Sequence, residues 1–328
     1  MVFRLLRIWA VATLVGCCAL PAQDKPDKIP VILDTDIGGD IDDALALVYA
    51  VRHPRLEVAG VTTVMDGSYR AEMALKLLEL LGRDDIPVVR GARNRLLKGN
   101  QPMAGAEKAP QMSALEGLAP PRRSPLPDFA PDWIVRQVMA RPGKITLVPY
   151  GPMTNIALAL MREPRLKEAV KEIVLMGGAL DRSGPEYNLK MDPEAARIVF
   201  ESGLLITMVG LDVTTKCRLK PEQVDAIAAA GTPLMKLLTG FLRAWQGGNP
   251  QQMPTLHDPL AVGVTADRSL VRLERMIIDL ETRGDFTAGA TVARRGPPEE
   301  LARRGVQVAV GVDADRFLRH FLETLLSH

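Results

Sequence analysis

The chain has 328 residues, of which 47% are hydrophobic, so it can bury one large core and we expect a single domain. Its formal net charge is only +2 and neither sign forms long runs, which argues against binding to nucleic acid or to a membrane surface. Aromatic residues make up 4% of the chain, which leaves few platforms for stacking single-stranded bases.

Residues 1–23 have the pattern of an export signal. Arg4 and Arg7 precede a short apolar run, and small residues follow it up to Ala22. The run is too short to span a membrane, and cleavage near Ala22 would release a periplasmic or extracellular protein. The four residues that end at Cys17 also fit a bacterial lipobox, which would place a lipid anchor on Cys17, although a chance cysteine in a signal peptide explains them equally well.

An acidic run follows the first expected strand. The apolar residues 29–33 predict a strand buried on both faces of a parallel sheet. The next ten residues contain five aspartates, which are Asp34, Asp36, Asp40, Asp42 and Asp43. Gly38 allows a sharp turn, and the last two aspartates open a helix with negative charge at the positive end of its dipole.

Such a group of carboxylates needs a positive partner if it is buried, and oxygen ligands suit calcium or magnesium better than zinc. The sequence therefore predicts a hard-cation site at the carboxyl end of a strand, where open α/β sheets bind ligands. Any single aspartate of the run could instead cap a helix or lie solvated in a loop.

Helix and strand patterns alternate along most of the chain, which predicts βαβ units and a parallel sheet. Strands are expected at 56–63, 86–89, 145–148, 173–176, 204–209, 273–280, 290–293 and 306–310. Helices are expected at 70–81, 133–140, 154–161, 192–201 and 314–326, with two more in 221–245 on either side of Gly231–Pro233. We expect one α/β domain over residues 24–328, with an open, mostly parallel sheet flanked by helices. Because Cys217 is its only cysteine, we expect no intramolecular disulfide.

The alternation fails between residues 91 and 131, where seven prolines interrupt the pattern. A connection of this length in a compact domain is usually functional or mobile. We therefore expect this segment to form a flap over the ligand crevice.

Two later segments place useful groups directly after a strand. Tyr150 precedes a Gly-Pro turn, where a carbonyl without a ladder partner can bind a hard cation. Gly177 and Gly178 end another strand and permit close backbone approach, and the following Asn188 can both donate to and accept from a pair of sugar hydroxyls.

Two later aspartates, Asp192 and Asp258, have different interpretations. Asp192 before Pro193 is typical of a helix cap, and we favour that role. His257 lies beside Asp258 in an expected loop, where a lone histidine is more often structural. The adjacent aspartate makes His257 the candidate for an imidazole acid.

These segments, in this order, resemble the motifs of the inosine-uridine preferring nucleoside hydrolases, which cleave N-ribosidic bonds with calcium. The resemblance covers roughly residues 29–325 and implies a Rossmann-like nucleoside hydrolase fold. It implies that Ca²⁺ is bound by the side chains of Asp36, Asp43 and Asp258 and by the backbone oxygen of Tyr150.

The resemblance also implies how a nucleoside would bind and react. Asp42 would hold the ribose 2′-hydroxyl, Asn188 the 2′/3′ edge and Glu186 the 5′-hydroxyl, while Met176 would pack against the sugar or base. In the implied hydrolysis to ribose and free base, Asp36 takes the proton of the attacking water. His257 then protonates or hydrogen-bonds the leaving base.

The chain departs from the family pattern at three places. Two extra residues lie between Gly38 and the Asp42–Asp43 pair, so Asp40 competes for any of these roles. Asp66 stands where the family has an asparagine that touches the ribose, and it could replace that asparagine as a substrate-binding acceptor but cannot donate when ionised. The loop at 180–185 is short and lacks a further family asparagine, which leaves recognition of the 5′-hydroxyl open.

Two other functions are compatible with the acidic run. One is an exported protein of the same fold that binds a nucleoside or sugar without turnover. The other is a haloacid-dehalogenase-like phosphatase, whose Asp-x-Asp loop needs a hydroxyl side chain where this chain has Gly38. In each case we expect a small-molecule partner, no nucleic acid and no membrane span, and the sequence is also compatible with a homo-oligomer.

Overall fold

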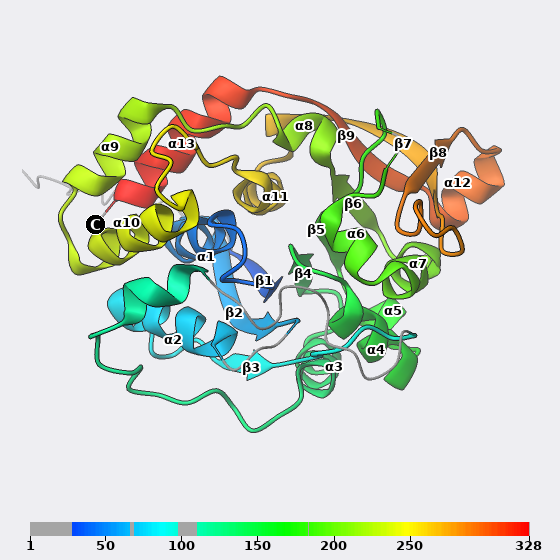
Figure 1. Ribbon diagram of the computed structural model, residues 1–328. Coiled ribbons are helices and arrows are strands. Elements are labelled where there is room, and N and C mark those ends of the chain that lie inside the picture. The colour runs from blue at the N-terminus through cyan, green and yellow to red at the C-terminus, as the bar shows by residue number, and fades with distance from the viewer. Residues whose placement is uncertain (1–27, 66–68, 98–109, 183, 328) are drawn as a thin grey trace, which may run out of the picture.

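The computed structural model describes residues 28–65, 69–97, 110–182 and 184–327. Its centre is a nine-stranded sheet with the order β3-β2-β1-β4-β5-β6-β9-β7-β8 (Figure 1). The strands are β1 (Ile29–Thr35), β2 (Leu56–Thr63), β3 (Val88–Arg90), β4 (Thr146–Pro149), β5 (Glu172–Met176), β6 (Ile206–Val209), β7 (Val271–Leu280), β8 (Thr291–Arg294) and β9 (Val306–Val312). The pairs from β3 across to β9 are parallel, and β7 is antiparallel to both of its neighbours.

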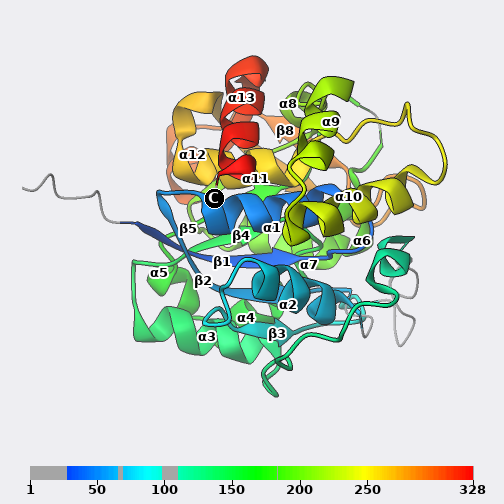
Figure 2. The ribbon, with the colours of Figure 1, turned by 90° about the vertical axis from the view of Figure 1, so that its left-hand side faces the viewer.

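Helices cover both faces of this sheet. They are α1 (Asp42–Arg52), α2 (Arg70–Leu80), α3 (Ala130–Ala140), α4 (Thr154–Arg162), α5 (Leu166–Ala169), α6 (Tyr187–Met191), α7 (Pro193–Glu201), α8 (Leu211–Thr214), α9 (Pro221–Ala229), α10 (Pro233–Gln246), α11 (His257–Ala266), α12 (Pro298–Arg304) and α13 (Ala314–Leu326), with 3-10 helices η1 (Pro110–Leu115) and η2 (Arg268–Leu270). Helices α1, α11 and α13 pack together on one side and α3, α4 and α7 on the other, with the sheet between them in Figure 2. Within the described ranges, no helix is both long and apolar enough to cross a membrane.

Strand β1 is buried on both faces, as its apolar sequence predicts. Val31 and Leu33 enter the hydrophobic core on the side of α1, whereas Ile32 enters the core on the side of α3 and α4. Successive side chains of a strand point to opposite faces, so a strand between two helical layers must be apolar throughout.

The predicted α/β architecture is confirmed, and most expected elements lie close to the observed ones. The expected first strand, the helix starting at Asp42 and the closing helix at 314–326 coincide with β1, α1 and α13. The segment at 257–266 is an exception, because it forms α11 where we expected a loop. Nearly all of α11 is buried, so it lacks the amphipathic period by which a surface helix can be predicted.

The described part of the long proline-rich connection contacts both a helix and an edge strand of the domain. Helix η1 packs against α10, and the backbone N–H of Leu126 donates to the carbonyl of Val88 on β3 at 2.8 Å. Residues 98–109, the middle of the segment predicted to form a flap, lie outside the described residues, so the flap stays a prediction.

The sheet topology defines where a ligand crevice can form. The chain places β2 and β3 on one side of β1 and then returns to place β4 on its other side. The connections after β1 and β4 therefore leave in different directions, and a crevice opens at their carboxyl ends.

Candidate active site

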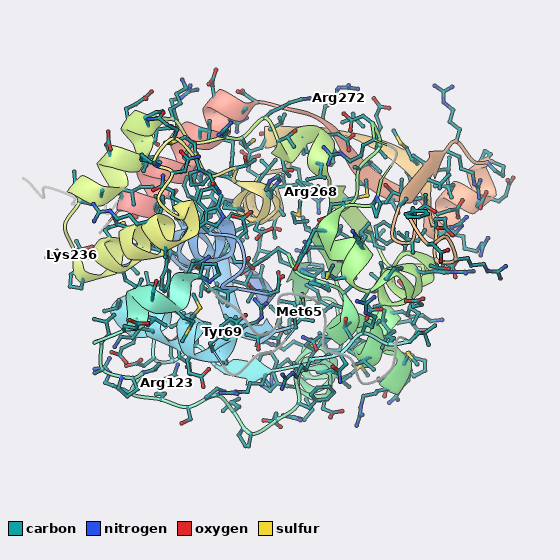
Figure 3. All side chains as sticks on the ribbon, in the orientation of Figure 1. Met65, Tyr69, Arg123, Lys236, Arg268 and Arg272 are labelled. Atoms are coloured by element: carbon teal, nitrogen blue, oxygen red, sulfur yellow. The ribbon has the colours of Figure 1, made fainter. Side chains whose placement is uncertain are left out.

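A cavity of about 620 Å³ opens at the carboxyl ends of β1, β4 and β5. Its lining includes the predicted site residues of the described chain, which are Asp36, Asp42, Asp43, Tyr150, Met176, Glu186, Asn188, His257 and Asp258. Asp40 also lines it, while Asp66 lies outside the described residues. A larger cavity, of about 760 Å³, lies at the amino ends of the strands beside Arg268, which Figure 3 labels, and none of the predicted residues line it.

Three buried aspartates meet in the active-site cavity. One carboxylate oxygen from each of Asp42, Asp43 and Asp258 lies within 4.8 Å of the others, and their exposed fractions are 2%, 3% and 4%. The backbone N–H of Asp258 donates to Oδ2 of Asp42 at 3.1 Å. Burial, and then the charges of neighbouring carboxylates, raise the pKa of all three well above its usual range. Such a set fits a hard divalent cation, which would offset both the burial and the repulsion.

The sequence prediction and this cluster overlap in two residues. Asp43 and Asp258, both expected to bind the cation, belong to the cluster. Its third member is Asp42, which we expected to hold the ribose, and the carboxylate of Asp36 lies near enough to raise the pKa of its neighbours Asp43 and Asp258. The carboxylates thus converge although Asp258 follows Asp42 by 216 positions.

The acidic loop is held at both of its ends. Gly38 has a φ of 108°, a backbone conformation that favours glycine, as expected for the sharp turn. The hydroxyl of Thr35 donates to Oδ1 of Asp43 at 2.5 Å and accepts from the backbone N–H of Ile37 at 3.1 Å. Thr35 therefore joins the end of β1 to the start of α1.

The two-residue insertion is fixed from outside the loop. The side-chain amide of Gln111 in η1 donates to the backbone carbonyl of Asp40 at 2.8 Å, and Gln111 itself is fully buried. Oδ1 of Asp40 accepts from the backbone N–H of Ile41 at 2.6 Å. Asp40 is an exposed residue that lines the cavity, and one oxygen of its carboxylate is bonded within its own loop.

Asp36 is seated against the turn that follows β4. A Cβ atom added at Gly151 would lie 2.9 Å from Oδ1 of Asp36 and 2.8 Å from Cγ1 of Val64, so only glycine fits there. Burial raises the pKa of Asp36, and the positive charge of Arg70 opposes that rise. The position of Asp36 therefore depends on β4 and α2 as well as on its own strand.

Asp34 has a different role from the other aspartates of the run. Its Oδ1 accepts from the hydroxyl of Thr62 at 2.5 Å and from the side-chain amide of Asn155 at 2.8 Å. It is fully buried, burial raises its pKa to about 7, and it does not line the cavity. Asp34 joins β1 to its neighbours, and the sequence did not distinguish it from the residues that face the cavity.

The part of the cavity that we predicted to hold the sugar is built around a helix start. Glu186 is the N-cap of α6, and its carboxylate accepts from the backbone N–H groups of Gly178, Asn188 and Leu189 at 3.2, 2.8 and 3.1 Å. Burial raises its pKa to about 7. The Gly177–Gly178 strand end thus provides the close backbone approach that we predicted there.

Asn188 connects two strand ends at the same place. Its side-chain amide donates to the carbonyl of Tyr150 at 3.3 Å and to the carbonyl of Met176 at 3.2 Å. The hydrogen bond from Asn188, a predicted ribose-binding residue, therefore orients the carbonyl of Tyr150, a predicted calcium ligand. Asp192 does cap α7, as predicted, since its carboxylate accepts from the backbone N–H of Ala195.

His257 begins α11, and its surroundings keep it neutral. Its Nδ1 lies 2.7 Å from the hydroxyl of Thr214. Burial, followed by the charge of Arg182, lowers its pKa to about 4. At neutral pH a neutral imidazole can donate a hydrogen bond from its one N–H to a leaving base, but it cannot act as an acid in the way that a protonated imidazolium does.

Several residues around the site were not expected from the sequence. They are the buried Arg70, the linking amide Asn155, and the cavity-lining residues Arg182, Tyr187, Lys190 and Trp245. Asn155 follows the Gly-Pro turn in a segment that was singled out only for the carbonyl of Tyr150. Trp245 lies in the last turn of α10, far from any motif, so no local pattern connects it with the cavity.

The chain matches known nucleoside hydrolases in sequence and in structure. The family described as inosine-uridine preferring nucleoside hydrolase matches residues 31–319. The chain is 35% identical over 302 residues to the non-specific ribonucleoside hydrolase RihC of Salmonella paratyphi C, an alignment that covers 88% of this chain and 95% of RihC. The fold superimposes on the plant nucleoside hydrolase PpNRh1 with a TM-score of 0.79 and 28% identity, covering 92% of this chain and 99% of that one. It superimposes on a purine-preferring ribonucleoside hydrolase from Gardnerella vaginalis with a TM-score of 0.78 and 32% identity, covering 90% and 98%.

Proposed function

Because this chain belongs to the inosine-uridine preferring nucleoside hydrolase family, we propose that it hydrolyses ribonucleosides with a calcium ion bound at the carboxyl ends of β1 and β4. Membership of the family makes it an N-glycosyl hydrolase that acts on nucleosides. The observation that carries the calcium proposal is the buried cluster of Asp42, Asp43 and Asp258. Three buried carboxylates repel one another and lose their hydration. This cost is offset by a bound cation of charge two or more, or by protonation of the carboxylates.

The proposed ligands are Asp36, Asp43, Asp258 and the carbonyl of Tyr150. Calcium takes six to eight oxygen ligands, so water and substrate hydroxyls can complete the set. Asp42 has one oxygen held by the N–H of Asp258, and we assign its other oxygen to the ribose 2′-hydroxyl. When bound, the cation would supply a Lewis acid that orients the attacking water and lowers its pKa.

The chain's own residues then perform the remaining steps. Water adds to C1′ of the ribose while the bond from C1′ to the base nitrogen breaks, and the bonding electrons leave with the base, which takes up a proton from solvent. A carboxylate oxygen of Asp36 takes the proton of the attacking water and returns it to solvent after the products leave. The surrounding negative charge stabilises the positive character that develops on the sugar.

The two ends of the nucleoside are held by different elements. We assign Asn188 in α6 and Glu186 at its cap to the sugar hydroxyls, and Met176, which lines the same cavity, to packing against the sugar or base. His257 hydrogen-bonds the leaving base as a neutral imidazole, since its pKa is lowered to about 4. Relatives are named non-specific in one case and purine-preferring in another, so the proposal specifies ribose and leaves the base to experiment.

The proposal is tested with a panel of purine and pyrimidine nucleosides, measured by release of reducing sugar in calcium-containing buffer. We expect turnover of at least one ribonucleoside, loss of turnover after chelation and recovery when calcium is restored. Tight nucleoside binding in calorimetry without release of base would favour a binding protein instead. Hydrolysis of generic phosphoesters alone would favour a phosphatase.

We also propose that the enzyme is exported through residues 1–23, which lie outside the described residues. The basic start, short apolar run and small residues before Ala22 support this. Cell fractionation and the mass of the mature protein test it, and a Cys17→Ala variant distinguishes a lipid anchor from simple cleavage. Full-length protein retained in the cytoplasm would reject export.

A further inference from the structure

A buried arginine lies between the acidic loop and the end of β2. Arg70, the first residue of α2, is 1% exposed. Its Nη1 donates to the carbonyl of Ile37 at 2.7 Å and its Nε donates to the carbonyl of Met65 at 2.9 Å. One guanidinium thus joins the acidic loop, which carries Asp36, to the connection between β2 and α2.

The backbone that Arg70 holds is unusual at Met65. This residue has a φ of 51°, the left-handed region, and it is the one non-glycine residue with positive φ in the described part of the chain. Side chains disfavour this conformation, so it persists only where neighbouring groups hold it. Met65 and Tyr69, labelled in Figure 3, both precede Arg70, and the hydrogen bond from Arg70 to Met65 spans this connection.

Arg70 also acts on the carboxylates by its charge. Burial raises the pKa of both Asp36 and Asp43, and in each case the charge of Arg70 opposes the rise. Among the described residues, its hydrogen bonds go to the carbonyl oxygens of Ile37 and Met65 rather than to a carboxylate. It is therefore a permanent cation beside a group of carboxylates that repel one another.

We propose that Arg70 is a built-in counter-charge that stabilises the folded acidic loop against the repulsion among its own carboxylates when no divalent cation is bound. The inference rests on the proposed calcium site. Arg70 and the cation are like charges that stabilise the same carboxylates, so each weakens the effect of the other. Loss of Arg70 should therefore harm the calcium-free protein more than the calcium-loaded protein.

The test compares thermal unfolding of the full chain in saturating calcium chloride and in chelator. The variant Arg70→Met removes both the charge and the hydrogen bonds. We expect its unfolding midpoint to fall further in chelator than in calcium, so that the increase produced by calcium exceeds that of the wild type. Titration calorimetry should show calcium binding about tenfold tighter than in the wild type, as expected when a nearby like charge is removed.

Two further variants separate charge from packing. Arg70→Lys keeps the charge, so its midpoint should fall by similar amounts in the two conditions. Lys76→Met is the matched control, because Lys76 is a buried cation on the same helix whose partner is Glu79, at 2.9 Å, rather than the acidic loop. It should lower the midpoint equally with and without calcium.

The outcomes separate this inference from the proposed function. A wild-type protein with no calcium-dependent increase in midpoint would reject the calcium site and this inference with it. If calcium raises the unfolding midpoint of the wild type and raises that of Arg70→Met by the same amount, only the role of Arg70 is rejected. If Arg70→Met does not fold without calcium but folds with it, the proposal is supported. If Arg70→Met folds in neither condition, the test passes to Arg70→Lys. A calcium-dependent increase in the unfolding midpoint of Arg70→Lys that exceeds the wild-type increase would show that the charge of residue 70 is not what matters, and would overturn the proposal.

Discussion

Two aspartates at the end of β1, Asp34 and Asp36, differ in what surrounds their carboxylates. Asp36 is 7% exposed, and its carboxylate lies against the turn after β4 and within the electrostatic reach of Arg70. Asp34, two positions earlier, is bound by Thr62 and Asn155 and takes no part in the lining of the cavity. The same residue type thus lines the cavity in one place, where we propose that it is the base, and serves as a structural link in the other, according to its neighbours.

The assignment of Asp36 as the base leads to a direct test. Asp36→Asn keeps the size of the side chain but cannot take a proton, so we expect turnover to fall by about 10² to 10⁴-fold. The melting temperature in calcium should change little by comparison. Steady-state assays of sugar release measure the first effect and calorimetry the second. Near-normal turnover in this variant would reject the role of Asp36.

Gly151 offers a steric test of the same position. In Gly151→Ala the new methyl group would lie 2.9 Å from Oδ1 of Asp36, so the carboxylate must shift and turnover should fall at least tenfold. Gly39→Ala is the matched control, since nothing lies within 4 Å of a Cβ atom at Gly39. Equal activity of the two variants would show that the close approach at Gly151 is unimportant.

Among the secondary-structure elements, α4 ties the carboxyl ends of several strands together. The side-chain amide of Asn155 donates to Oδ1 of Asp34 at 2.8 Å and to the carbonyl of Thr63 at 2.9 Å. Its oxygen accepts from the backbone N–H of Ala92 at 2.8 Å. One buried amide therefore connects β1, β2 and the residues after β3, and so supports the floor of the crevice.

Removal of this amide should destabilise the whole sheet edge. Asn155→Ala removes one hydrogen bond from each of three buried polar groups, and we expect a loss of about 3 kcal/mol in the free energy of unfolding. Chemical denaturation in urea measures it. Thr265→Val is the control, because that buried hydroxyl donates to the carbonyl of Ala261 within its own helix and its loss should cost little. A similar stability of the two variants would contradict the linking role of Asn155.

In the whole molecule, the first and last helices of the domain close on each other. Helix α1 packs against α13, and His53, just after α1, lies with its ring 5.1 Å from that of His320 and 5.4 Å from that of Tyr49. Burial, then the charges of His320 and Arg55, lower the pKa of His53 to about 4, while Asp267 has a smaller opposite effect. This contact joins parts of the chain that are far apart in sequence, remote from the active site.

The sign of the resulting pH dependence follows from linkage. The unfolded His53 binds a proton below about 6.5, whereas the folded one does so only below about 4. Stability from this group is complete above 6.5 and is lost as the pH falls through this window. The variant His53→Asn retains an acceptor for the N–H of Arg55 and removes the titration. Its unfolding midpoint should decline less than that of the wild type between these pH values, and parallel curves would refute the assignment.

Local sequence determined the fold class and most elements of this protein. The apolar run of β1, the acidic loop and the start of α1 are adjacent in the chain, so strand burial, turn and helix cap are all set by neighbours a few residues away. The α/β alternation follows from the same short-range periodicities, and the parallel sheet follows from the alternation. The order of the motifs was sufficient to indicate the family.

Only the tertiary structure decided which residues meet and in what state. Asp258 reaches Asp42 across 216 positions because α11 packs beside α1, and α11 has no periodic pattern from which it could be predicted. The neutral state of His257 and the place of Arg70 beneath the acidic loop depend on burial by elements remote in sequence. Helix packing and desolvation are properties of the assembled core, and they therefore have no signal in any short window of the chain.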